Sequence, residues 1–171
     1  ATPYGISISE DDSTLIVTTA GSDKVITMDA NSGEVLGRVD VEAVPRGVAL
    51  TSFEDGRPSQ AWVLNAVENT VSLVDVSNTF EPNLVGTILL EDPTHPTVKR
   101  GRKAFETASA STTGTFACAS CHADGHTDQL LWVLNTPIVT GGDQIQPRTT
   151  MPIRGLRDTE PYHWDGIPGD P

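Results

Sequence analysis

The chain has 171 residues, 37% of them hydrophobic, which is enough to build one sizeable domain or two small ones. No apolar run approaches the length that spans a bilayer, which excludes a membrane-embedded chain. The formal net charge of −12 argues against nucleic-acid and anionic-lipid partners and favours a basic protein partner, although an acidic surface usually serves solubility alone.

Short strands separated by turn residues are predicted from Pro3 to about Leu90. The apolar segments "YGISIS", "LIVTT", "VITMD" and "VLGRVDV" are divided by "EDDS", "GSDK" and "NSGE". Strands at short, even spacings that are joined by Asn, Asp, Gly and Ser turns are typical of an antiparallel meander.

This meander repeats within the chain. "PYGISI" at Pro3–Ile8 matches "PRGVAL" 42 residues later, and "LIVTTAGSDKVITMD" at Leu15–Asp29 matches "AWVLNAVENTVSLVD" 46 residues later. The extra residues of the second copy fall in the loop "TSFEDGRPSQ", where an insertion costs little. A four-stranded unit with this period predicts β-propeller blades; a plain β-sandwich is the alternative.

The pattern resembles the YVTN/NHL-like bacterial propeller family, in which "P-x-G-[IV]-x-[IL]" opens a blade and "V-x-x-[MV]-D" closes its third strand. The resemblance covers residues 3 to about 90. Two blades cannot close a ring and would leave sheet edges unpaired. We therefore expect Ala1 to lie inside a longer propeller, with further blades from the same or an associated chain.

A second part is expected after "LLEDPTHP", because Pro93 and Pro96 break any strand. "TVKRGRKAFETAS" predicts a short amphipathic helix with Val98 and Phe105 on one side. The predicted domains are all-β blades over 1–92 and a mainly α, loop-rich domain over 93–171. A loop-rich segment with so little apolar core needs something else to pack around.

Both cysteines of the chain lie in "CASCH", together with His122. C-x-x-C-H is the attachment signal for c-type haem. Residues three apart share a face of a helical turn, so the thiols of Cys118 and Cys121 can reach the two vinyl groups of one porphyrin. His122 follows at once, and its imidazole can then bind the iron. The motif predicts a covalently bound haem c.

Two other functions of the cysteines stay open. A redox-active dithiol uses C-x-x-C, but it expects a βαβ setting and has no need of the histidine. A zinc site could recruit Cys118, Cys121 and His126, but it lacks a fourth ligand.

The surrounding residues resemble the cytochrome c domains of the di-haem peroxidase/MauG-like superfamily, and most of all those fused to bacterial propellers. The resemblance covers residues 97–171 and rests on two blocks. The first block matches at Gly101, Phe105, Cys118, Cys121, His122, Asp124, Gly125, Asp128 and Trp132. The second matches at Pro152, Arg154, Gly155, Leu156, Thr159, Pro161, Tyr162, Asp165 and Gly166. His163 departs from the family pattern by one position, where Trp164 stands instead.

The ligand opposite His122 decides between functions. His163 is the first candidate, because a Pro- and Gly-bounded loop can present it to the iron, and Met151 is the second. His126 lies only four residues from His122 and would stay on the proximal side. A ligand outside the chain, or an open position, is the remaining possibility.

Other residues are expected around the haem itself. Arg154 is a candidate partner of a haem propionate, and Trp132 and Trp164 are candidates for packing on the porphyrin. The carbonyl before Pro137 is a candidate acceptor for the ring nitrogen of His122.

Three functions follow from the haem expectation. The first is electron transfer through haem on a propeller scaffold, with a redox protein as the partner. The second is a peroxidase or MauG-like oxidase, which would need a second haem outside these residues. The third is a binding module with a structural haem. The sequence leaves open whether the chain is an enzyme. Covalent haem attachment implies a periplasmic or extracellular location, and the lack of a closing C-terminal helix implies that the haem domain continues beyond Pro171.

Overall fold

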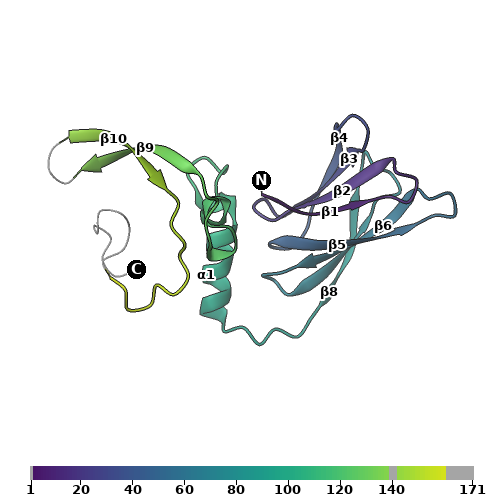
Figure 1. Ribbon diagram of the computed structural model, residues 1–171. Helices are drawn as coiled ribbons and strands as arrows, with labels where there is room; N and C mark the ends of the chain where they lie inside the picture. The colour runs from purple at the N-terminus through teal and green to yellow at the C-terminus, as the bar shows by residue number, and fades with distance from the viewer. Residues whose placement is uncertain (1, 139–141, 161–171) are drawn as a thin grey trace. The chain divides into compact units, whose positions relative to one another are not determined.

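The computed structural model describes residues 2–138 and 142–160. The chain forms two compact units, Ala1–Ser120 and Cys121–Pro171, and each is described by itself (Figure 1). The domain boundary predicted between residues 92 and 93 stays a prediction. Within the described residues, no helix has the length and apolar character needed to cross a membrane.

The first unit contains two four-stranded antiparallel sheets, each a simple meander. The first sheet has the strands β1 (Pro3–Ile8), β2 (Thr14–Thr19), β3 (Lys24–Asp29) and β4 (Val35–Asp40). The second has β5 (Pro45–Ser52), β6 (Pro58–Asn65), β7 (Thr70–Asp75) and β8 (Asn83–Leu89). In both sheets the strands pair in chain order, as in propeller blades, which confirms the predicted repeat. We call the first sheet blade 1 and the second blade 2.

Acidic and amide side chains make the tight turns between these strands. Asp12, Asp23 and Asn69 adopt left-handed backbone conformations, which Asp and Asn tolerate better than other non-glycine residues. The Asp29 carboxylate accepts hydrogen bonds from the backbone N–H groups of Asn31 and Ser32, which closes the β3–β4 turn. These local bonds explain why the turn clusters in the sequence marked strand ends so well.

The apolar core of the first unit lies between the two blades. Ile16 and Val25 from blade 1 are fully buried, and they share one core with Ala61, Val63, Val74 and Val76 of the second half of the unit. Strands β1 and β5, the first strand of each blade, approach each other closely. The approach is so close that a side chain at Gly5 would collide with the carbonyl oxygen of Arg46. The two blades therefore pack face to face as successive blades.

Helix α1 (Pro96–Glu106) follows the blades and confirms the predicted amphipathic helix. Pro96 occupies the start of the helix, where its missing N–H is harmless, and the His95 side chain accepts a hydrogen bond from the Thr97 N–H. No residue of α1 is buried. Apolar packing therefore does not hold this helix in place.

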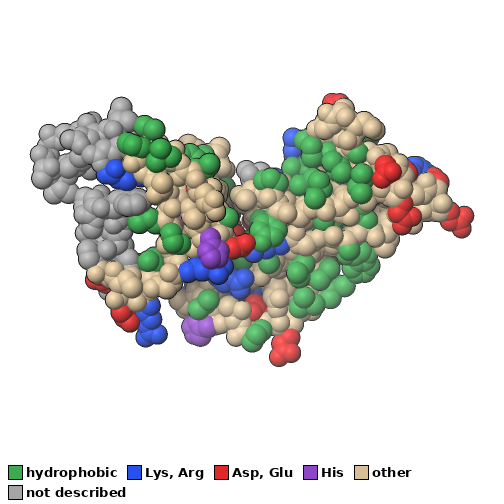
Figure 2. All heavy atoms as spheres, in the orientation of Figure 1, with side chains coloured by type: hydrophobic (Ala, Val, Ile, Leu, Met, Phe, Trp, Pro, Cys, Tyr) green, Lys and Arg blue, Asp and Glu red, His purple; other side chains and the backbone are tan. Residues whose placement is uncertain are grey.

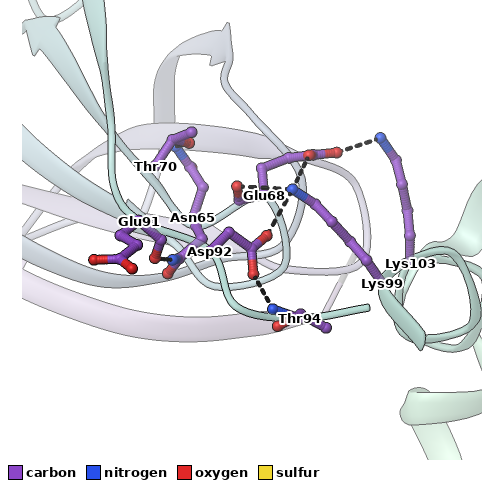
Figure 3. A network of polar contacts seen from close by, with 9 residues as sticks. Asn65, Glu68, Thr70, Glu91, Asp92, Thr94, Lys99 and Lys103 are labelled. Atoms are coloured by element: carbon purple, nitrogen blue, oxygen red, sulfur yellow. Dashed lines mark hydrogen bonds and ion pairs between the residues drawn. The ribbon is translucent and has the colours of Figure 1, made fainter. Parts of the chain in front are cut away.

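Ion pairs attach α1 to blade 2 (Figure 3). The Lys99 ammonium lies 3.1 Å from the Glu68 carboxylate and 3.0 Å from that of Asp92. Lys103 reaches the other oxygen of Glu68 at 2.8 Å. At the far end of the helix, the Glu106 carboxylate lies 2.7 Å from the Arg46 guanidinium. The contacts that fasten α1 are therefore mostly charged.

The rest of the chain contains little helix. The short 3-10 helix η1 (Ala108–Ala110) and the one-turn helix α2 (Cys118–Cys121) lead to the 3-10 helix η2 (Ala123–Gly125). Strands β9 (Leu131–Ile138) and β10 (Gly142–Thr149) then form an antiparallel hairpin. The mainly α domain expected over 93–171 is thus not evident in the described residues, where a hairpin follows the short helices.

Prolines hid this hairpin from sequence analysis. Pro137 and Pro147 each lie inside a strand, where proline normally argues against one. In a two-stranded sheet both strands are edges, so a missing N–H can lie on the unpaired side. The isolated hairpin therefore tolerates prolines that a central strand would exclude.

Candidate functional site

The two cysteines lie on the single helical turn α2. Hydrogen bonds at its start hold the turn: the Ser120 N–H donates to the Ala117 carbonyl, and the Ala117 N–H donates to the Ser120 hydroxyl. Cys118 is exposed and Cys121 half-buried, and no disulfide joins them. The helical turn gives the thiols the three-residue spacing that attachment to one porphyrin needs.

His122 follows α2 directly and carries an unsatisfied polar atom. Its Nδ1 is buried and has no hydrogen-bond partner among the described residues. The bond expected to the carbonyl before Pro137 is not formed in this structure. A buried polar atom without a partner costs about 1–3 kcal/mol, and Asn65 and Thr107 also carry such atoms away from this motif.

A compact loop turns the chain back after His122. Asp124 and Gly125 both have left-handed backbone conformations, with φ of 53° and 77°. The Asp128 N–H donates to the Cys121 carbonyl at 2.9 Å and closes the loop onto the end of α2. Asp-Gly is a turn signal in sequence, so this part of the site was readable in advance.

The second sequence block lies against this loop. The Ile153 N–H donates to the Gly125 carbonyl at 3.0 Å, and the Thr127 hydroxyl donates to the Thr150 carbonyl at 2.8 Å. Arg154 donates from Nε and Nη2 to the carbonyl oxygen of Asp124 at 2.9 and 2.6 Å. The structure thus joins two segments that the sequence analysis connected only by family resemblance.

Arg154, which was expected to bind a haem propionate, has a structural role within the chain. Its guanidinium holds the backbone of the loop after the cysteines. This contact cannot be predicted from the sequence, because every residue offers the same backbone carbonyl as an acceptor. Whether the same arginine also meets a propionate stays a prediction.

Trp132 is tied to the same loop from the start of β9. Its indole N–H donates to the Asp128 carboxylate at 3.0 Å. Partial desolvation raises the pKa of Asp128, but hydrogen bonds from the Leu130 N–H, the Thr150 hydroxyl and the Trp132 indole outweigh it. The net effect is a pKa below the ordinary value, so these bonds favour the charged carboxylate.

Of the remaining candidate residues, the structure describes Met151 and His126. Met151 is half-buried beside the second block, and His126 is exposed. His163 and Trp164 lie outside the described residues. Within residues 2–138 and 142–160, no group of three or more His, Cys, Asp and Glu side chains is arranged to hold a metal ion.

Apolar side chains of the second unit lie open to solvent. None of its residues whose burial is described is buried. Its large exposed hydrophobic residues are Leu130, Leu131, Val133 and Leu156. This agrees with the expectation that the segment needs something else to pack around.

The chain is similar to known proteins only over about half of its length and only in solved structures. No family model and no curated protein matches the chain. Hydrazine synthase from Kuenenia stuttgartiensis is 31% identical over 53% of this chain and 24% of its own, with a TM-score of 0.45. BamB from Moraxella catarrhalis is 19% identical over 52% of this chain and 24% of its own, with a TM-score of 0.42.

The β-propeller domain of Cps50 (Swd1) from Myceliophteria thermophila is 18% identical over 52% of this chain and 29% of its own, with a TM-score of 0.43. The chain therefore spans between 24% and 29% of the length of these three structures. The assignment of propeller blades in this chain is carried by its own strand order and internal repeat.

Proposed function

We propose that the chain carries a covalently attached c-type haem on Cys118, Cys121 and His122 and transfers electrons through it, with the blades as scaffold. The observation that carries this proposal is the "CASCH" run, which contains the only two cysteines of the chain. Each thiol would add its S–H across one vinyl group, forming a thioether without loss of any atom. His122 would supply the proximal ligand to the iron.

The local structure fits this group in two respects. The cysteines lie three apart on one helical turn, outside any disulfide. The exposed apolar residues around the motif would gain burial against a porphyrin. When bound, the haem iron supplies a one-electron couple whose potential depends on its ligands.

The chain's own residues would shape the haem surroundings. His163 or Met151 is proposed as the second ligand to the iron. The choice matters for the reduction potential, because methionine raises it relative to a second histidine. Trp132 and Trp164 are proposed to shield the porphyrin from water. Arg154 is proposed to neutralise a propionate while it holds the loop at Asp124.

Partners and location follow from the same proposal. The net charge of −12 favours a basic redox protein as the electron partner. Attachment of haem c takes place outside the cytoplasm, so the proposed location is periplasmic or extracellular. Further blades, from the same or an associated chain, would complete the scaffold.

An optical spectrum of protein matured by a c-type assembly system tests the proposal. We expect a low-spin c-type spectrum, oxidised and reduced, that cyanide does not change. The Cys118→Ser/Cys121→Ser variant should lose the covalent haem, and His163→Ala against Met151→Ala should identify the distal ligand. A high-spin spectrum that shifts with cyanide would favour a peroxidase or MauG-like oxidase. Absence of haem from correctly matured protein would refute the attachment.

A further inference from the structure

Each blade has an outer face that points away from the other blade. The outer face of blade 2 is the repeat equivalent of the blade 1 face that packs against blade 2. Side chains alternate along a strand, and directly paired residues share a face of the sheet. Blade 1 turns Ile16 and Val25 towards blade 2. The repeat equivalents in blade 2, 46 residues later, are Trp62 and Val71, and they lie on the face that points away from blade 1.

This outer face of blade 2 is apolar and open. Trp62 is 36% exposed and Leu64 42%, and Ile88 from β8 lies on the same face. The outer face of blade 1 has the same character, since Ile6 is 66% and Ile8 50% exposed. Figure 2 shows hydrophobic side chains on the surface of the blades in one view.

Two pairs of equivalent glycines also relate the outer face of blade 2 to the inner face of blade 1. Gly5 of blade 1 leaves room for the Arg46 carbonyl of blade 2, and its equivalent is Gly47. A side chain at Gly47 would touch only Leu64 of its own sheet, at 3.5 Å or more. The space that Gly5 gives to the next blade is therefore present again in front of Gly47.

The second pair lies on the outer strands. Gly37 pairs with Thr27, and Gly86 pairs with Leu73 at the equivalent place in blade 2. Gly37 is crowded by Thr79, Phe80 and Pro82 of the loop before β8. Among the described residues, nothing lies within 4 Å of a Cβ built at Gly86.

We propose that a second copy of this chain binds head to tail, with its blade 1 on the outer face of blade 2. Tyr4 of the second copy, the equivalent of Arg46, would then lie over Gly47. Ile6 and Ile8 of the second copy would cover Trp62 and Leu64, as Val48 and Leu50 cover blade 1 within the chain. The second copy is the chosen occupant because its blade 1 carries the same repeat that blade 2 already presents to blade 1. The proposal depends on the blade fold and not on the haem. Of the two sources expected above for further blades, it takes the associated chain, here a second copy.

Such an interface joins two different faces, so it can be tested by complementation. Sedimentation of the whole chain should show association that increases with concentration. Ile6→Glu blocks one face and Leu64→Glu the other, and each variant alone should stay monomeric. An equimolar mixture should form a dimer and nothing larger, because each partner keeps one intact face.

Two controls protect this test. Ile6 and Leu64 are exposed, so unchanged circular dichroism and thermal unfolding would verify that both variants fold. Gly47→Ala adds a Cβ that makes only ordinary contact with Leu64 of its own sheet, at 3.5 Å or more. It should raise the dissociation constant about tenfold or more by filling the space for the second copy. Val98→Glu, the same kind of change on α1, should leave association unchanged. A chain that is monomeric at every concentration, a single variant that still dimerises, or a mixture that stays monomeric would each overturn the proposal.

Discussion

Single residues around "CASCH" show which parts of a site sequence can predict. Cys118, Cys121 and His122 were predicted as haem-binding residues from their spacing alone, because the attachment chemistry fixes both the residue types and their separation; this role stays a prediction. The contact from Arg154 to the Asp124 carbonyl was not predictable, since any residue offers the same acceptor. The indole bond of Trp132 to Asp128 depends on the loop conformation and was likewise out of reach.

The glycine at 125 should be sensitive to substitution. Gly125→Ala places a side chain at φ 77° and brings its Cβ to 3.1 Å from the Arg154 side chain. Gly114→Ala is the control, since it has φ 65° and nothing within 4 Å among the described residues. We expect each to lose about 1–2 kcal/mol from the left-handed conformation, and Gly125→Ala to lose more in urea unfolding. Equal losses would contradict a role for the Arg154 contact.

Trp132 should report the charge of Asp128. The folded pKa of Asp128 lies below the ordinary aspartate value of 3.8, so its stabilising bonds are complete above that pH and are lost as the pH falls through the folded pKa. The indole N–H resonance of Trp132 should therefore shift with a midpoint below pH 3.8. Asp128→Asn should remove the shift. A midpoint above 3.8 would contradict this assignment.

At the scale of elements, the blade strands and α1 followed their sequence patterns, whereas the β9–β10 hairpin did not. The blades combine alternation, turn residues and an internal repeat, and these signals agree. In the hairpin, Pro137 and Pro147 oppose a strand locally, and only the pairing of two edge strands permits them. The mainly α expectation came from the family resemblance and had no periodic segment beyond α1 to support it.

The attachment of α1 should depend on pH and salt. Hydrogen bonds from Lys103 and Lys99 lower the pKa of Glu68, and the bond from Lys99 is the main cause that lowers the pKa of Asp92 to about 2. These pairs are therefore complete above pH 4.5 and are lost as the pH falls towards 2. Glu68→Gln should speed amide exchange in α1 at neutral pH, and added salt should speed it in the wild type.

Glu91→Gln is the matched control for this experiment. It makes the same chemical change on an exposed residue just before Asp92, away from the lysine pairs. Its α1 amides should exchange like those of the wild type. Slow exchange in Glu68→Gln, equal to the control, would show that the Glu68 ion pairs do not hold the helix.

At the scale of the molecule, the folding of the two blades should be coupled through their shared core. Ile16→Ala removes a fully buried side chain between the blades and should cost about 2–5 kcal/mol in urea unfolding. Ile6→Ala, on the outer face, should cost far less when measured at concentrations where the chain is monomeric. Probes in blade 1 and blade 2 should unfold together, and separate transitions would contradict a common core.

The polar attachment of α1 has a consequence for proteolysis. Apolar cores change little with ionic strength, whereas ion pairs weaken, so high salt should release α1 while the blades stay intact. Lys99 and Arg100 would then become the first sites cut by trypsin. A single cut there would separate the blades from the segment that contains the two cysteines, and leave each as a distinct fragment.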